Sequence, residues 1–112
     1  MNISVKSVHF HADAKLLTYV EKKVNRLGKL FNRIEGVEII LKLQDSGGKI
    51  QEKITEIRMH VPGGWLMDKK TGKTFESAID TSVDTLKRQL VRYKEKLADH
   101  TNEKIGDQSR RA

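Results

Sequence analysis

The sequence predicts an α+β fold of the order β-α-β-β-β-α, with two helices packed on one face of a four-stranded sheet. Two long segments, residues 13–31 and 74–97, repeat apolar residues at the three- and four-residue spacing of a buried helical face. The other apolar segments are rich in β-branched residues and are separated by glycine turns, which is typical of strands. A chain of 112 residues has room for one such core.

The amino-terminal part of the chain predicts a strand, a helix and a central strand. Residues 3–8 are rich in β-branched side chains and form a strand that ends before Asp13. Asp13 is a good N-cap, and the apolar helical face that follows it consists of Leu16, Leu17, Val20, Val24, Leu27, Leu30 and Phe31. Gly36 supplies a flexible stop, and residues 37–43 form a central strand of branched apolar residues.

Two glycine turns place the remaining strands. The turn at residues 46–48 reverses the chain into a strand in which Ile57, Met59 and Val61 alternate with polar residues, so the apolar set faces the core. A second turn at residues 62–64 leads into a short last strand. A right-handed crossover through the first helix makes the first two strands parallel, and the turns make the other pairs antiparallel.

Thr74 is the predicted N-cap of the second helix. The apolar face of this helix consists of Phe75, Ala78, Ile79, Val83, Leu86, Leu90, Tyr93 and Leu97. Residues 101–112 are almost entirely polar and predict a flexible tail, so the folded domain is expected to span residues 1–100.

The composition favours a polyanionic partner. Lysine and arginine (22) exceed aspartate and glutamate (15), which gives a net charge of +7. There is no cysteine, which excludes thiol chemistry and fits a reducing cytoplasm, and no segment has the roughly 20 apolar residues of a membrane span. We therefore expect a cytoplasmic protein with no membrane partner.

The positive charge is concentrated on the predicted helices. Residues 15–33 contain six bases and one acid, and residues 86–97 contain five bases and one acid. Acidic partners one helical turn away are almost absent, which favours a binding face, although a merely solvated face remains the alternative. The predicted loop at residues 69–73 adds three lysines before a helix start. The candidate RNA-binding residues are Lys22, Lys23, Arg26, Lys29, Lys69, Lys70, Lys73, Lys87, Arg88, Arg92, Lys94 and Lys96.

Few aromatic residues are available for reading bases. Aromatics make up 5% of the chain, so recognition of the phosphates and shape of structured RNA fits better than stacking on bases. Trp65 is open to two interpretations, a stacking platform or a half-buried strand residue.

The segments that resemble catalytic or metal-binding motifs are incomplete. Residues 71–74 resemble the end of a P-loop, but Met67 stands where that motif needs its first glycine. His9 and His11 form an H-x-H pair without a third ligand nearby. We predict no enzyme activity, cofactor, metal or small-molecule substrate.

The second helix carries three short segments, residues 77–80 (SAID), 86–90 (LKRQL) and 93–97 (YKEKL), and residues 31–34 and 37–43 precede them. In this order the segments resemble the ribosome hibernation-promoting factors, and the resemblance covers roughly residues 1–100. It implies a fold similar to double-stranded-RNA-binding domains and a place in the channel of the small ribosomal subunit, where messenger and transfer RNA would be displaced. Its basic positions here are Lys23, Arg26, Lys29, Lys87, Arg88, Arg92, Lys94 and Lys96.

The chain departs from the family's pattern at one place and resembles its short form. The family commonly has Asp-Met-Tyr where this chain has Thr74-Phe75-Glu76. The chain also resembles the short form, without the acidic tail of the ribosome-associated inhibitor or the dimerisation domain of long factors. Short forms can act with a small ribosome modulation factor.

The leading hypothesis is a translation inhibitor of stationary phase or stress that binds ribosomal RNA of the small subunit. A general double-stranded-RNA-binding module and a basic protein-interaction adaptor remain the alternatives.

Overall fold

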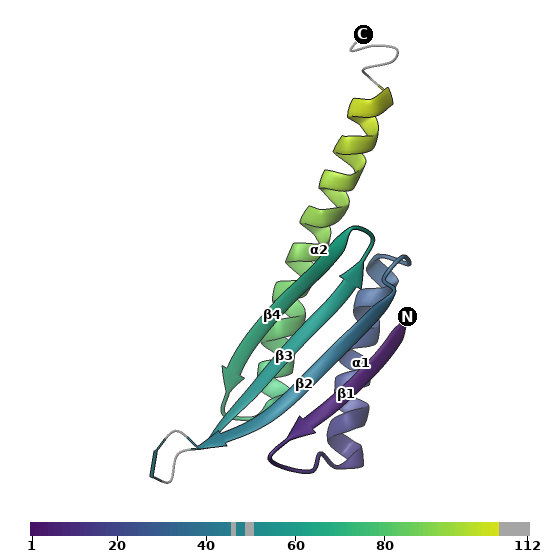
Figure 1. The fold of residues 1–112 in the computed structure, drawn as a ribbon. Helices are drawn as coiled ribbons and strands as arrows, with labels where there is room; N and C mark the ends of the chain where they lie inside the picture. The colour runs from purple at the N-terminus through teal and green to yellow at the C-terminus, as the bar shows by residue number, and fades with distance from the viewer. Residues whose placement is uncertain (46, 49–50, 106–112) are drawn as a thin grey trace.

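The computed structural model of the chain describes residues 1–45, 47–48 and 51–105. The elements follow in the predicted order: β1 (Asn2–Val8), α1 (Ala14–Leu30), β2 (Gly36–Asp45), β3 (Gln51–Val61), β4 (Gly64–Gly72) and α2 (Phe75–Ile105). The strands form one sheet in the order β1-β2-β3-β4, and both helices lie on the same face of it (Figure 1). The fold class predicted from the sequence is confirmed.

Strand pairing follows the predicted directions. β1 is parallel to β2, with Ile3 opposite Val37, because α1 carries the chain back across the sheet. The β2–β3 and β3–β4 pairs are antiparallel. Val61 pairs with Gly64, so a two-residue turn closes the last hairpin, and Gly63 has a φ of 89° that side chains other than glycine rarely adopt.

The core lies between the helices and the sheet. Ile57, Met59 and Val61 are buried while the residues between them point to the other face, as predicted. The most deeply buried apolar residues of the helices are Val20, Val24, Leu27, Ile79, Leu86 and Leu90. Each such side chain stabilises the fold by about 1.5–3 kcal/mol relative to its exposed state, so this layer fixes how α1 and α2 lie against the sheet.

Both predicted N-caps are confirmed. The Leu16 backbone N–H donates to Asp13 Oδ1 at 2.8 Å, and the Ser77 N–H donates to Thr74 Oγ1 at 3.0 Å. Phe75 is buried and stacks on Phe10, with 4.6 Å between the ring centroids. The departure at residues 74–76 therefore retains a cap followed by a core residue.

Three boundaries differ from the sequence prediction. β4 extends to Gly72, so Lys69 and Lys70 lie in a strand and not in a loop, because β3 pairs with it along nine residues. Gly36 begins β2 and is not a stop. α2 continues through Ile105, so the predicted polar tail begins as helix, while residues 106–112 lie outside the described residues.

Candidate nucleic-acid interface

The outer face of α1 carries three of the predicted bases. Lys22, Arg26 and Lys29 are spaced by four and three residues, so they share one side of the helix, and all three are exposed. None of them has an ion-pair partner among the residues that the structure describes. Their charges are free to meet an anion.

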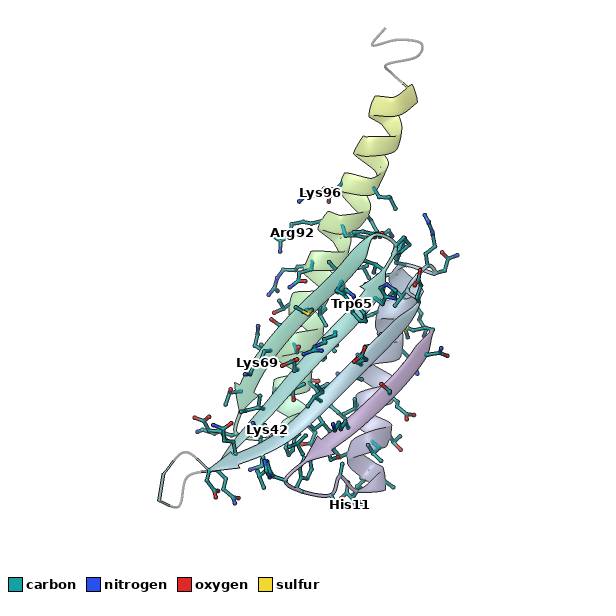
Figure 2. The ribbon with its side chains drawn as sticks, viewed as in Figure 1. His11, Lys42, Trp65, Lys69, Arg92 and Lys96 are labelled. Atoms are coloured by element: carbon teal, nitrogen blue, oxygen red, sulfur yellow. The ribbon has the colours of Figure 1, made fainter. Side chains whose placement is uncertain are left out.

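The middle of α2 presents a second set of exposed bases, namely Lys87, Arg88, Arg92 and Lys96. Arg92 and Lys96 line a shallow hollow with Leu66 and Tyr93, on the side of α2 next to β4 (Figure 2). Lys87 instead faces α1. The bases of α2 therefore spread around its solvent-facing half, and within the described part of the chain none of these four forms an ion pair.

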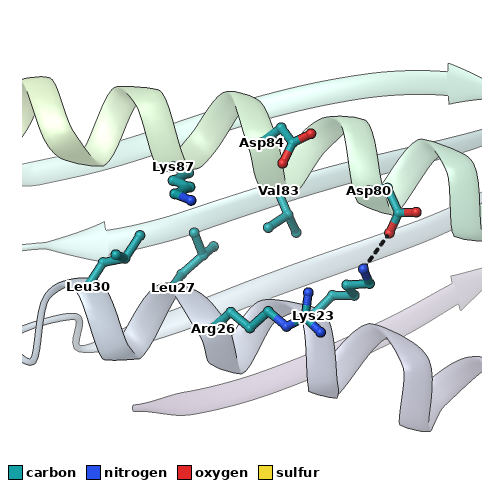
Figure 3. A pocket seen from close by; sticks show the side chains of 8 residues that line it. All are labelled: Lys23, Arg26, Leu27, Leu30, Asp80, Val83, Asp84 and Lys87. Atoms are coloured by element: carbon teal, nitrogen blue, oxygen red, sulfur yellow. Dashed lines mark ion pairs between the residues drawn. The ribbon is translucent and has the colours of Figure 1, made fainter.

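A groove of about 320 Å³ separates the two helices and brings predicted bases from both together (Figure 3). Lys23 and Arg26 line it from α1, and Lys87 lines it from α2. Asp80 and Asp84 also line it, and Lys23 Nζ lies 3.4 Å from Asp80 Oδ1. These two carboxylates precede the basic segment of residues 86–97 on α2, so the groove is of mixed charge although that segment is strongly positive.

Asp80 joins the helices through a second contact. The Tyr19 hydroxyl donates to Asp80 Oδ1 at 2.6 Å, and this hydrogen bond, followed by burial, raises the pKa of Tyr19 to about 12. Lys23 Nζ lies 5.5 Å from the centroid of the Tyr19 ring. Sequence reasoning missed Tyr19 and Asp80 because the two residues lie 61 positions apart.

Two further predicted bases serve the fold. Lys70 Nζ binds Asp68 Oδ1 at 2.7 Å, and this carboxylate is largely buried. Lys94 Nζ donates to the backbone carbonyl of Leu30 at 2.6 Å, at the carboxyl end of α1. The last carbonyls of a helix lack partners within it and attract cations, so this contact ties α2 to α1.

The last two predicted lysines lie away from the groove. Lys73 is exposed just before α2 begins. Lys69 projects from β4 on the face opposite the helices, because neighbouring side chains of a strand alternate and Leu66 packs against the core (Figure 2). A single RNA-binding surface on the helices therefore does not include Lys69.

Neither a metal centre nor a membrane span is found in the part of the chain that the structure describes. No three histidine, aspartate or glutamate side chains there come close enough to hold an ion. No helix there combines the length and apolar character that crossing a bilayer requires.

Comparison with known proteins assigns a family to this architecture. The profile of the family described as "Sigma 54 modulation protein / S30EA ribosomal protein" matches residues 3–98. The ribosome hibernation promoting factor of Azotobacter vinelandii is 32% identical over 96 residues, which cover 86% of this chain and 85% of that protein. The ribosome hibernation promoting factor of Escherichia coli strain K12 is 30% identical over 103 residues, covering 89% of this chain and all of that protein.

Two solved structures share the fold. The N-terminal domain of Thermus thermophilus Protein Y superposes with a TM-score of 0.71 at 29% identity, over 83% of this chain and 99% of that one. A ribosomal subunit interface protein from Coxiella burnetii superposes with a TM-score of 0.73 over 85% of this chain and 99% of that one. At 22% identity, the second likeness concerns the fold alone.

Proposed function

We propose a function for this chain on the basis of its family. The chain belongs to the Sigma 54 modulation protein / S30EA ribosomal protein family, and the two relatives named above are ribosome hibernation promoting factors. The chain is a short hibernation factor that binds the small ribosomal subunit and inhibits translation. It occupies the channel used by messenger and transfer RNA, in the cytoplasm, during stationary phase or stress. Members of this family are not enzymes, so inhibition is steric.

The observation that carries the proposal is the set of unpaired bases on both helices. Among the described residues, Lys22, Arg26 and Lys29 on α1 have no carboxylate partner, and the same holds for Arg88 and Arg92 on α2. Surface bases that serve only solubility are usually interspersed with acids. Unpaired bases that follow two neighbouring helices instead suit a folded RNA, whose phosphates supply sequence-independent affinity.

The groove bases act differently in this proposal. Lys23 is matched by Asp80, so it contributes less net charge to RNA binding than Arg26 or Lys87. Together with Tyr19, the Lys23–Asp80 pair links α1 to α2 above the core that packs them side by side. A rigid pair of helices presents its outer bases in one geometry, which lowers the entropic cost of docking.

Charge reversal on α2 tests the proposal. We expect the Arg88→Glu/Arg92→Glu double variant to lose co-sedimentation with purified small subunits while keeping its melting temperature, because both side chains are exposed. Lys6→Glu/Lys42→Glu on the open face of the sheet is the matched control, since it changes the net charge equally. Unchanged co-sedimentation of the first variant, or equal loss in both, would refute binding through α2.

Two further measurements separate the alternatives. An excess of free duplex RNA should strip the protein from ribosomes only if it is a general double-stranded-RNA-binding module. Ribosome profiles of starved cells on sucrose gradients, with and without the protein, test hibernation itself and show whether a modulation factor is needed.

A further inference from the structure

The open face of the sheet, opposite the helices, carries an exposed aromatic group. Trp65 on β4 is 49% exposed and Met67 on the same face is 56% exposed. The Trp65 ring stacks on His60 of β3, with 4.5 Å between centroids and 20° between planes. Strand pairing places these two residues directly opposite each other, so the sheet supports the stack.

A cavity of about 320 Å³ adjoins this stack. Its walls include Trp65, His60, Glu35 and Glu38, with the backbone of Gly36 between them. The charged side chains that line it are carboxylates, and no lysine or arginine of the described part of the chain lines it. In a chain of net charge +7, this is a local reversal of sign.

Of the two carboxylates, one is engaged and one is open to a ligand. Glu35 Oε2 already lies 2.9 Å from His60 Nδ1 at the rim of the cavity. Glu38 pairs across the ladder with Arg58, but the Arg58 guanidinium lies 2.9 Å from Glu56 instead. Glu38 therefore has no ion-pair partner among the described residues.

We propose that this cavity on the open sheet face binds an arginine side chain from a basic segment of a protein partner. A guanidinium can stack on an indole face while it donates to a carboxylate. His60 covers one face of Trp65 and engages Glu35, so the arginine would use the other indole face together with Glu38. Exposed Met67 beside Trp65 can cover the apolar stem of the incoming residue.

Single-stranded RNA fits this cavity less well. A base could stack on Trp65, but its phosphates would then approach Glu35 and Glu38, which repel them. The unpaired bases of the helices lie on the opposite side of the sheet. At physiological salt the screening length is about 8 Å, so they do not prevent a cation from binding here. The surface is thus separate from the proposed RNA-binding helices, and its test needs no ribosome.

Trp65 is the only tryptophan, so the intrinsic tryptophan fluorescence comes from this site, and the variants below locate the binding. We expect a blocked glycine–arginine pentapeptide to change this fluorescence saturably, and a glycine–lysine pentapeptide to bind more weakly because lysine lacks a planar group. Glu38→Gln should weaken arginine-peptide binding about five-fold. Glu52→Gln, towards the other end of β3 on the same face, is the matched control and should bind like the wild type.

Melting temperatures of both variants check that they fold. Arginine-peptide binding by Glu35→Gln is a second measurement at the same site. The proposal is overturned if the wild type shows no saturable change, or if Glu38→Gln and Glu52→Gln lose affinity equally. It is also overturned, in favour of base stacking, if oligouridylate quenches Trp65 more strongly than the arginine peptide and Glu38→Gln strengthens that quenching.

Discussion

Replacing single bases by alanine should distinguish cations that bind RNA from cations that the fold uses. Arg92 is exposed and has no ion-pair partner among the described residues, whereas Lys70 lies 2.7 Å from the largely buried Asp68. If Arg92 contacts a phosphate, Arg92→Ala removes one released counterion, and the slope of log affinity against log salt becomes shallower by about 0.7–0.9. Lys70→Ala should leave the slope unchanged and lower the free energy of unfolding by about 2 kcal/mol, because Asp68 loses its partner.

The salt dependence of the wild-type affinity follows from the number of bases that remain free to meet phosphates. Lys23, Lys70 and Lys94 are engaged by Asp80, Asp68 and the Leu30 carbonyl, and Lys69 lies on the other face. If about six of the remaining bases meet phosphates, the slope is about −4 to −5. Affinity for small subunits should then fall by about 250- to 1000-fold between roughly 50 and 200 mM salt.

The assay is fluorescence anisotropy of labelled protein with purified small subunits, measured over this salt range at constant magnesium concentration. The reasoning is refuted if Lys70→Ala flattens the slope as much as Arg92→Ala does. A wild-type slope near zero would refute it as well, because binding would then not depend on phosphate neutralisation.

Three predictions concern the fold that positions the helices. Phe75→Ala should lower the free energy of unfolding by about 4 kcal/mol in urea titrations, since it empties a buried site and removes the stack on Phe10. Thr55→Val should raise it by about 1 kcal/mol, because the buried Thr55 hydroxyl has no hydrogen-bond partner among the residues that the structure describes; a loss of stability would show that the hydroxyl is satisfied. The raised pKa of Tyr19 means that its protonated form stabilises the fold, and this contribution is complete when the pH is below the ordinary pKa of 10.0. The contribution should disappear as the pH rises through the folded value of about 12. Tyr19→Phe should therefore remove this alkaline loss of stability from melting curves.

Much of the fold could be read from local sequence because its signals act over a few residues. Asp13 and Thr74 cap backbone groups three residues away, so their N-cap roles could be recognised without the fold. The alternation at Ile57, Met59 and Val61 likewise follows from the two-residue period of a strand. The basic residues of α1 and α2 could also be assigned to helix surfaces from the sequence, because composition and helical spacing can be read without knowing any long-range contact.

The candidate site could be predicted only in part. The sequence identified the bases, but it could not show that Lys94 caps α1 or that Lys23 is matched by Asp80. It also left Trp65 undecided between a stacking platform and a strand residue, and the structure shows a strand residue that is half exposed beside two carboxylates.

What the sequence by itself determined is the element order, the caps, the apolar faces and the excess of positive charge on the helices. Only the tertiary structure decided which charges remain free. Tyr19 meets Asp80 across 61 positions and Lys94 meets Leu30 across 64, because α1 and α2 pack side by side on one sheet. Likewise, Lys69 and Lys70 lie in a strand and not in the predicted loop, because β4 pairs with β3 along this segment. Such contacts depend on hydrophobic packing of the whole core, and no local pattern encodes them.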